Sequence, residues 1–211
     1  MCASAGSRRA ISFLRQAALL AIIVAASGCA TQRETLTLPD LGGWAARTGF
    51  LAGADKFEFA ARIGVKTTDD GFNGKLRWIQ DGAAFEATVG GPLGVGTVRI
   101  EGEGDAVVLT DNDGARTELG DVETDLLLRY GWTIPVSSLR YWALGIPDPE
   151  APAETRFHAD GLLASLEQRG WTVIISHYRD GGAGQPMPYR LSASNAGTRV
   201  RIVIDKWLFF E

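Results

Sequence analysis

Cysteine and histidine are nearly absent from this 211-residue chain, which holds two of each. Cys2 and Cys29 both lie within the first 29 residues, so no thiol and no disulfide is available to the rest of the chain. His158 and His177 lack the spacing of metal-binding motifs such as HExxH. We therefore expect no metal site, no thiol nucleophile and no disulfide framework.

Other signatures of catalysis are missing too. The chain has no GxSxG elbow, and residues 71–76 (GFNGKL) are too short for a phosphate loop and lack the Ser or Thr after the lysine. The glycine pairs at 94/96 and 102/104 lack the third glycine of a dinucleotide motif. The sequence predicts a protein that is not an enzyme and has no cofactor. A hydrolase with an unrecognised site is one alternative.

An excess of positive charge is also missing. The 25 acidic and 21 basic residues give a formal charge of −4. A general nucleic-acid binder would show a basic patch or stripe, so nucleic acid is not an expected partner.

Apolar runs long enough to cross a bilayer are absent, and a shorter one marks the N-terminus. Residues 17–26 (AALLAIIVAA) form a ten-residue apolar run after three arginines, and Ala26-Ser27-Gly28-Cys29 follows it. This resembles a bacterial lipobox, which predicts that residues 1–28 are a lipoprotein signal peptide and that Cys29 carries covalent lipid. Ordinary signal cleavage beside a chance cysteine is the alternative. Ala30, in place of the aspartate that retains lipoproteins in the inner membrane, favours the outer membrane.

Cleavage before Cys29 would remove the three arginines and lower the formal charge from −4 to −7. Residues 29–40 are polar and predict a lipidated tether, whose twelve residues reach at most about 40 Å. Residues 41–211 show no fixed repeat and no inner boundary. We expect them to form one domain.

Alternating apolar residues predict strands over most of this domain. The clearest strand places every second side chain on one face: Phe57, Phe59, Ala61, Ile63 and Val65. Similar alternation predicts strands near 76–80, 85–89, 98–100, 107–109, 116–119, 162–169, 171–176, 190–194 and 199–210, and residues 69–71 (DDG) predict a turn.

Helices are expected at 41–52 and in the middle of the chain. Asp121 can cap a helix that Gly131 ends, and a second helix begins at Pro135 and stops at Gly145. Residues 148–154 read as a proline-rich loop. This order of elements predicts an α+β fold, and a sheet of about nine to eleven strands must curve into a barrel or half-barrel.

The unusual feature of the sequence is apolar. Five tryptophans lie between residues 78 and 207, and both central helices are rich in Leu, Trp and Tyr. A curved sheet covered by such helices would enclose an apolar ligand pocket, unless these side chains only fill a core. Leu93 stands in a loop of glycine and proline (GGPLGVG), where it is free either to enter lipid or to fold back.

Several segments resemble the LolB family of outer-membrane lipoproteins. The most specific is 131–147 (GWTIPVSSLRYWALGIP), with its Pro-apolar-x-x-Leu-Arg-x-Trp core followed by Gly and Pro. The other matching features, in chain order, are the lipobox, Trp78, Pro92-Leu93-Gly94, the strand of Trp171, residues 185–188 (QPMP) and residues 205–207 (DKW).

The resemblance implies a half-open antiparallel β-barrel with a helical lid over an apolar cavity. It implies a receptor on the periplasmic side of the outer membrane, which accepts acylated lipoproteins from the soluble carrier LolA. The receptor then inserts them, without nucleotide, into the inner leaflet of that membrane. The implied partners are LolA, the acyl chains of the cargo and outer-membrane phospholipid, and the protein would act as a monomer.

Carried to this chain, the resemblance assigns roles to particular residues. Pro92, Leu93 and Gly94 would form the membrane-inserting loop. The lid would include Leu126, Leu127, Leu139 and Trp142. The cavity wall would include Trp78, Phe85, Val98, Ile100 and Trp171. The main alternative is a structural outer-membrane lipoprotein that scaffolds envelope assembly and has a packed interior, and a further one is a soluble LolA-like carrier, which would lack Cys29.

Overall fold

The computed structural model describes residues 43–91, 96–103, 106–131 and 135–210. By its internal contacts the chain divides into residues 1–35 and residues 36–211, and every described residue belongs to the second unit. The buried apolar cluster of this unit extends from Leu51 to Trp207. A unit with its own core is expected to fold by itself.

Eleven strands form one antiparallel sheet in the order β6-β5-β4-β3-β2-β1-β13-β12-β9-β8-β7. Their bounds are β1 Lys56–Lys66, β2 Gly71–Asp81, β3 Ala84–Gly90, β4 Val98–Glu103, β5 Ala106–Thr110, β6 Arg116–Leu119, β7 Glu154–Phe157, β8 Leu163–Gln168, β9 Trp171–Ser176, β12 Arg190–Ser194 and β13 Arg199–Phe209. A separate pair joins β10 (Arg179–Asp180) to β11 (Pro186–Met187).

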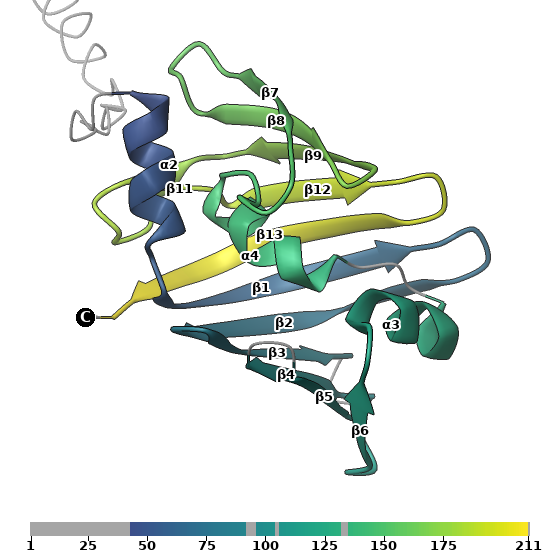
Figure 1. Cartoon of the computed structure of the whole chain (residues 1–211). Helices are drawn as coiled ribbons and strands as arrows, with labels where there is room; N and C mark the ends of the chain where they lie inside the picture. Colours follow the sequence, from purple (N-terminus) through teal and green to yellow (C-terminus); the bar gives the residue numbers. More distant parts are fainter. Residues whose placement is uncertain (1–42, 92–95, 104–105, 132–134, 211) are drawn as a thin grey trace, which may run out of the picture. The chain divides into compact units, whose positions relative to one another are not determined.

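The first and last strands, β1 and β13, lie side by side in the middle of the large sheet (Figure 1). From β1 at the centre, β2 to β6 follow in sequence to one edge. The helices α3 (Val122–Tyr130) and α4 (Val136–Leu144) then lead to β7 at the opposite edge. The chain returns through β8, β9 and β12 to β13, which pairs with β1. Because β6 and β7 do not pair, the sheet is open, and the predicted α+β fold with a curved antiparallel sheet is confirmed.

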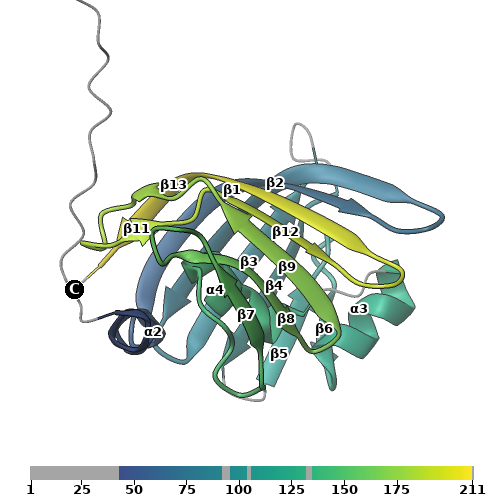
Figure 2. The same cartoon turned by 90° about the horizontal axis from the view of Figure 1, so that it is seen from above.

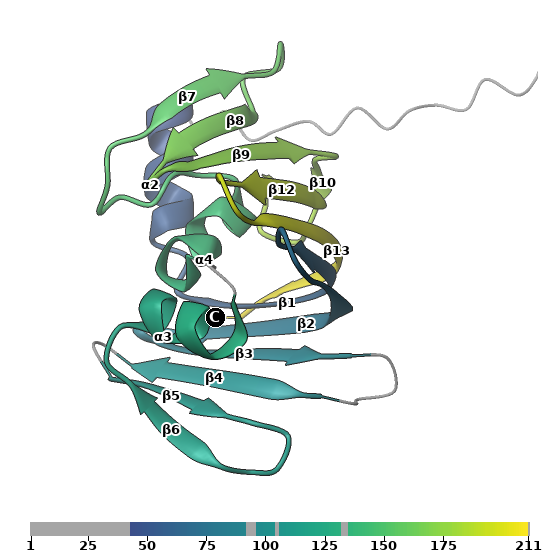
Figure 3. The same cartoon turned by 90° about the vertical axis from the view of Figure 1, so that its right-hand side faces the viewer.

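Figure 2 shows the sheet arching over α4, and Figure 3 shows α3 and α4 on the same concave side. The helix α2 (Trp44–Ala52) lies beside the ends of the strands near β11 (Figure 1). None of the described helices is both long enough and apolar enough to cross a membrane.

The alternation in β1 explains why the side chains on the concave face of the sheet are apolar and buried. Its five apolar residues from Phe57 to Val65 are at most 4% exposed, whereas Arg62 and Lys66 between and beyond them are exposed. The same pattern continues in Leu76 and Trp78 of β2. The predicted strands and their inward faces are confirmed here, because a period of two matches the pleat of a half-buried strand.

The helices end where their capping residues predict. Asp121 accepts a hydrogen bond from the backbone N of Thr124 at 2.7 Å, and Gly131 closes α3 with φ of +68°. Pro135 is the N-cap of α4, one position before the expected first turn. Gly145 ends α4 with φ of +78°, where a Cβ would lie 2.9 Å from Pro188 and Tyr178, so glycine is required.

Three features differ from the sequence-based expectation. The strand β2 begins at Gly71, which the sequence placed in a turn, because residues 71–75 also pair with β1. The loop predicted for 148–154 gives way at Glu154 to β7, an edge strand whose burial pattern does not alternate. A bulge where β7 pairs with β8 also buries Leu163 completely, next to Leu162, although strict alternation would turn one of them outward.

Candidate functional site

The residues predicted to line a cavity lie on the concave face, on β2, β3, β4 and β9. Trp78, Ile100 and Trp171 are buried, whereas Phe85 and Val98 are half-buried. All five belong to, or pack against, one hydrophobic cluster. The structure therefore brings them together on one apolar surface.

A row of aromatic rings crosses this surface from β3 to β13. Phe59 lies directly opposite Trp78 on one side and Trp207 on the other. The ring of Phe59 is 6.2 Å from that of Trp78 and 5.0 Å from that of Trp207, and Trp78 stacks on Phe85 at 5.0 Å. Such contacts add stability beyond the burial of area. Phe59 and Trp207 were not among the predicted cavity residues, although the alternation of their strands already placed Phe59 on the inner face.

The polar ends of these indoles are satisfied inside the protein. Trp207 Nε1 donates to the carbonyl of Pro188 at 3.0 Å, and Trp78 Nε1 donates to Gln80 Oε1 at 3.2 Å. The Gln80 amide nitrogen donates in turn to the carbonyls of Gly82 and Ala84. The indole N–H groups of both tryptophans in the aromatic row therefore have acceptors within the protein.

The helix α4 packs closely onto the sheet. Leu139 and Trp142, both predicted lid residues, are buried, and the ring of Trp142 lies 6.3 Å from that of Trp171. Trp142 Nε1 donates to Gln168 Oε1 of β8 at 2.8 Å.

A buried polar network fixes α4 to β8 and to the segment after α4. Gln168 Oε1 also accepts from the backbone N of Asp148 at 3.0 Å, and its amide nitrogen donates to the carbonyls of Asp148 and Ala151. The Asp148 carboxylate accepts from Ser138 Oγ at 2.7 Å and from Arg169 Nε at 3.1 Å. Buried networks of this kind rigidify the elements that they join.

The helix α3 is more exposed than α4. Leu126, a predicted lid residue, is buried, but Leu127 is 45% exposed and Leu128 is 77% exposed. Glu123 in the first turn accepts a hydrogen bond of 3.5 Å from Ser137 Oγ of α4. Burial raises the pKa of the Glu123 carboxyl above its ordinary value. One side of α3 therefore faces the core while two adjacent leucines face outward.

Half-buried apolar side chains gather on the same half of the domain as α3. They are Phe72 of β2, Phe85 and Val89 of β3, Val98 of β4 and Val122 of α3. The opposite half, beneath α4, has completely buried residues such as Leu163, Val173 and Ile175. The concave face is therefore less completely covered beside β2–β4 than beside β8 and β9.

Some predicted site residues lie outside the described residues. These are Cys29 and the loop residues Pro92, Leu93 and Gly94. The described chain stops at Gly91 and resumes at Gly96, between β3 and β4.

A buried arginine that the sequence analysis did not single out fixes α2. Arg47 is 5% exposed and donates to Gln185 Oε1 at 3.1 Å and to the carbonyl of Pro186 at 2.7 Å. Burial lowers the pKa of the Arg47 guanidinium and raises that of the Tyr178 phenol, whose ring lies 5.8 Å away. Periodicity gave no signal for Arg47, because its partners are 138 and 139 residues distant.

Each histidine lies within hydrogen-bond distance of one oxygen atom of the protein. His158 Nε2 lies 3.1 Å from the carbonyl of Ile175, and His177 Nδ1 lies 3.1 Å from Ser176 Oγ. Among the residues that the structure describes, no group of three or more His, Cys, Asp or Glu side chains could hold a metal ion. The concave face therefore presents an apolar surface that is covered by the fixed helix α4 and the more exposed helix α3.

Comparison with known proteins identifies relatives over nearly the whole chain. The family model described as "Outer membrane lipoprotein LolB" matches residues 55–207. The chain is 32% identical over 199 residues to the outer-membrane lipoprotein LolB of Pseudomonas fluorescens, covering 93% of this chain and 97% of the relative. It is 28% identical over 188 residues to LolB of Francisella tularensis, covering 89% and 91%.

Solved structures with this fold have little sequence in common with the chain. A LolA superfamily protein from Nitrosomonas europaea aligns with a TM-score of 0.55 at 9% identity, covering 78% of this chain and 94% of that one. A putative outer membrane lipoprotein-sorting protein domain from Vibrio parahaemolyticus aligns with a TM-score of 0.50 at 10% identity, covering 80% and 91%. At such identities the likeness shows the fold alone.

Proposed function

Because the chain belongs to the LolB family of outer-membrane lipoproteins, we propose that its concave face is the surface that takes up the acyl chains of other lipoproteins. The family is a non-enzymatic receptor of the lipoprotein localisation pathway, at the outer membrane. To this family role the proposal adds where the cargo lipoprotein comes from, which surface binds it and where it is delivered. The soluble carrier LolA delivers the cargo, the concave face holds its acyl chains, and the inner leaflet of the outer membrane receives it.

The observation that carries this proposal is the unequal covering of the concave face. The buried network of Gln168 and Asp148 fixes α4, whereas α3 leaves Leu127 and Leu128 exposed beside half-buried apolar side chains of β2–β4. An acyl chain that enters between α3 and these strands would meet Phe85, Val98 and the aromatic row. In this reading α3 is the movable part of the lid and α4 is its fixed part.

The energetics require a shielded handover. Each exposed CH₂ of an acyl chain costs about 0.8 kcal/mol in water, so an acylated protein does not diffuse freely through the periplasm. The sequence holds no nucleotide-binding motif, and transfer therefore runs downhill from carrier to receptor to membrane. A difference of only about 1.4 kcal/mol biases each step tenfold.

Two sequence predictions complete the proposal. Lipid on Cys29 keeps the domain at the membrane, and Leu93, which stands between Pro92 and Gly94 in the sequence, enters lipid and lowers the barrier to release. The β3–β4 connection leaves the sheet beside Val89 and Val98, two of the half-buried residues. The loop would therefore touch lipid next to the proposed acyl site.

The test uses residues 30–211, which lack the signal and Cys29 but keep the whole compact unit. They are mixed with a purified carrier–lipoprotein complex without nucleotide, and the location of the lipoprotein is followed by affinity capture. We expect it to move onto residues 30–211. In a second stage with liposomes, Leu93→Glu should accept cargo normally and deliver it more slowly.

Phe50→Glu, at an exposed position of α2, is the control for the added charge. Failure of a folded domain to accept cargo from a competent carrier would overturn the proposal and favour a structural scaffold with a packed interior. Equal delivery by the parent and Leu93→Glu would overturn only the role of the loop.

A further inference from the structure

Six basic side chains gather on the convex face of the sheet, opposite the proposed acyl site. They lie in three successive rows across the adjacent strands β2, β1, β13 and β12. We call this set the basic face: Arg62, Lys66, Lys75, Arg190, Arg199 and Arg201. All six side chains are exposed, and they stand on a chain whose formal charge is negative.

The basic face places like charges directly opposite each other. Arg62 of β1 pairs in register with Lys75 of β2, and Lys66 of β1 pairs with Arg199 of β13. Directly opposed like charges destabilise an antiparallel sheet. Stability of the fold therefore does not account for this arrangement, whereas an anionic partner would relieve the repulsion.

Carboxylates neutralise only part of the basic face. Asp205 pairs with Arg62 at 3.0 Å, and Asp69 and Asp70 lie in the β1–β2 turn beyond Lys66. Among the described residues, no carboxylate lies within salt-bridge distance of Arg190 or Arg201. The centre of the basic face thus stays positively charged.

A shallow groove of about 460 Å³ runs through this centre. Its lining includes Arg62, Arg190 and Arg201 together with Ile174, which is 56% exposed although it is large and apolar. Basic groups around an exposed aliphatic side chain are the mixture found on surfaces that bind at the membrane interface.

We propose that the basic face binds the anionic headgroups of membrane phospholipid. The family places the chain at a membrane, so such a surface is always within reach. One row of the basic face also reaches β3, because Lys75 pairs with Gly90, one residue before the described chain stops at Gly91. Headgroups bound there would hold the domain with the convex face of β2, β1, β13 and β12 toward the bilayer. The inference concerns orientation on the membrane and does not rest on acyl uptake.

The experiment measures binding of residues 30–211 to vesicles by flotation. Vesicles of phosphatidylcholine are compared with vesicles that contain about one third phosphatidylglycerol, at about 0.02 M and 0.3 M salt. We expect binding to the anionic vesicles alone, and weaker binding at the higher salt. The double variant Arg190→Gln/Arg201→Gln should lower the partition coefficient at least about tenfold, because each basic group near an anionic surface contributes on the order of a fivefold factor.

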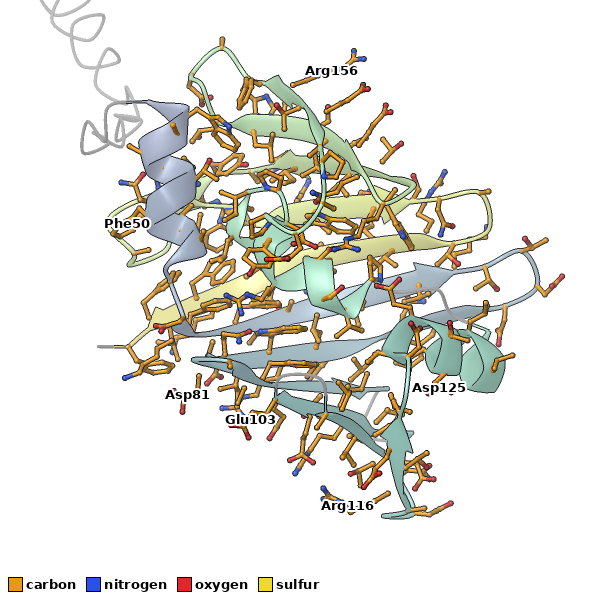
Figure 4. All side chains as sticks on the ribbon, viewed as in Figure 1. Phe50, Asp81, Glu103, Arg116, Asp125 and Arg156 are labelled. Atoms are coloured by element: carbon orange, nitrogen blue, oxygen red, sulfur yellow. The ribbon has the colours of Figure 1, made fainter. Side chains whose placement is uncertain are left out.

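The matched control is Arg116→Gln/Arg156→Gln, which removes the same charge from exposed positions on the edge strands β6 and β7 (Figure 4). It should bind as the parent does. Equal loss in both double variants would show a net-charge effect and overturn the proposal, as would equal binding to neutral vesicles or no binding at all.

A further arm adds a soluble polyglutamate peptide. If the peptide binds at the basic face and the vesicles do not, the surface docks an acidic protein and the proposal is wrong.

Discussion

Gln168 joins four groups of the protein through one buried amide side chain. Its oxygen accepts from Trp142 Nε1 and from the backbone N of Asp148, and its nitrogen donates to two carbonyls. Alternation from Leu162 and Leu166 places residue 168 on the inner face, so its burial follows from the sequence. Its partners do not, because they lie 17 to 26 residues away and meet it only in the folded domain.

We predict that Gln168→Leu lowers the free energy of unfolding by about 2–4 kcal/mol. The substitution keeps the volume but leaves two buried donors, the indole N–H of Trp142 and the amide N–H of Asp148, without acceptors. Urea denaturation measures the change. Glu167→Leu, at the exposed neighbouring position, is the control and should change the free energy by less than about 0.5 kcal/mol. A loss of that small size in Gln168→Leu would contradict the role given to the network.

For the predicted cavity residues, too, the sequence indicates which face a side chain lies on but not which side chains it contacts. Period-two patterns indicate which side chains share a face, and Trp78, Phe85, Val98 and Ile100 do share it. The aromatic row also depends on which strands are neighbours, and β13 reaches β1 from the other end of the chain. No local pattern in the sequence reports that pairing.

The helices α3 and α4 illustrate how far local sequence signals determine where a helix begins and ends. Capping residues predicted the ends of both helices, since Asp121, Gly131 and Gly145 satisfy or terminate the backbone locally. Which helix is fixed depends on tertiary contacts, and the buried network under α4 was not visible in the sequence. The edge strand β7 was missed for the same reason, because pairing with β8 creates it.

The pKa of Glu123 predicts a pH dependence of the stability of α3. Because burial raises the pKa of this carboxyl, the folded state favours its protonated form. Its contribution to stability is fully present below its unfolded pKa and is lost as the pH rises through the raised folded pKa. At neutral pH the ionised carboxylate therefore carries a cost, which Glu123→Gln should remove while keeping an acceptor for Ser137.

We expect Glu123→Gln to raise the Tm by about 1–2 °C at pH 7.5, an amount reduced by the partial exposure of the side chain. At pH 4 the variant and the parent should melt together. Thermal denaturation at the two pH values measures the difference. Glu118→Gln on β6 is the control for loss of an exposed negative charge. A lower Tm of Glu123→Gln at pH 7.5 would show that ionised Glu123 stabilises α3.

At the scale of the whole molecule, the longest strands lie at the centre of the sheet and the shortest at its edges. The longest registers join β1 to β2 and to β13, whereas the edge strands β6 and β7 have four residues each. Pairing β1 with β13 closes a loop of more than one hundred residues. The chain entropy lost on closure must be offset by the contacts of the aromatic row. Curvature toward a barrel or half-barrel follows from the number of strands, as the sequence predicted, whereas the half-open form was implied by the family resemblance alone. The order of the strands required the structure.

This organisation predicts a gradient of hydrogen exchange across the sheet. Amides of β1, β2 and β13 should exchange most slowly, through global unfolding, because they lie over the buried aromatic row. Amides of β6, β7 and α3 should exchange faster by at least about tenfold, since each of these elements has solvent on one side and can open alone. Native-state exchange followed by mass spectrometry measures the gradient. Protection of α3 equal to that of α4 would contradict a lid that opens at α3 while the buried network holds α4. Equal protection of β6 and β1 would contradict a sheet whose stability is concentrated at its centre.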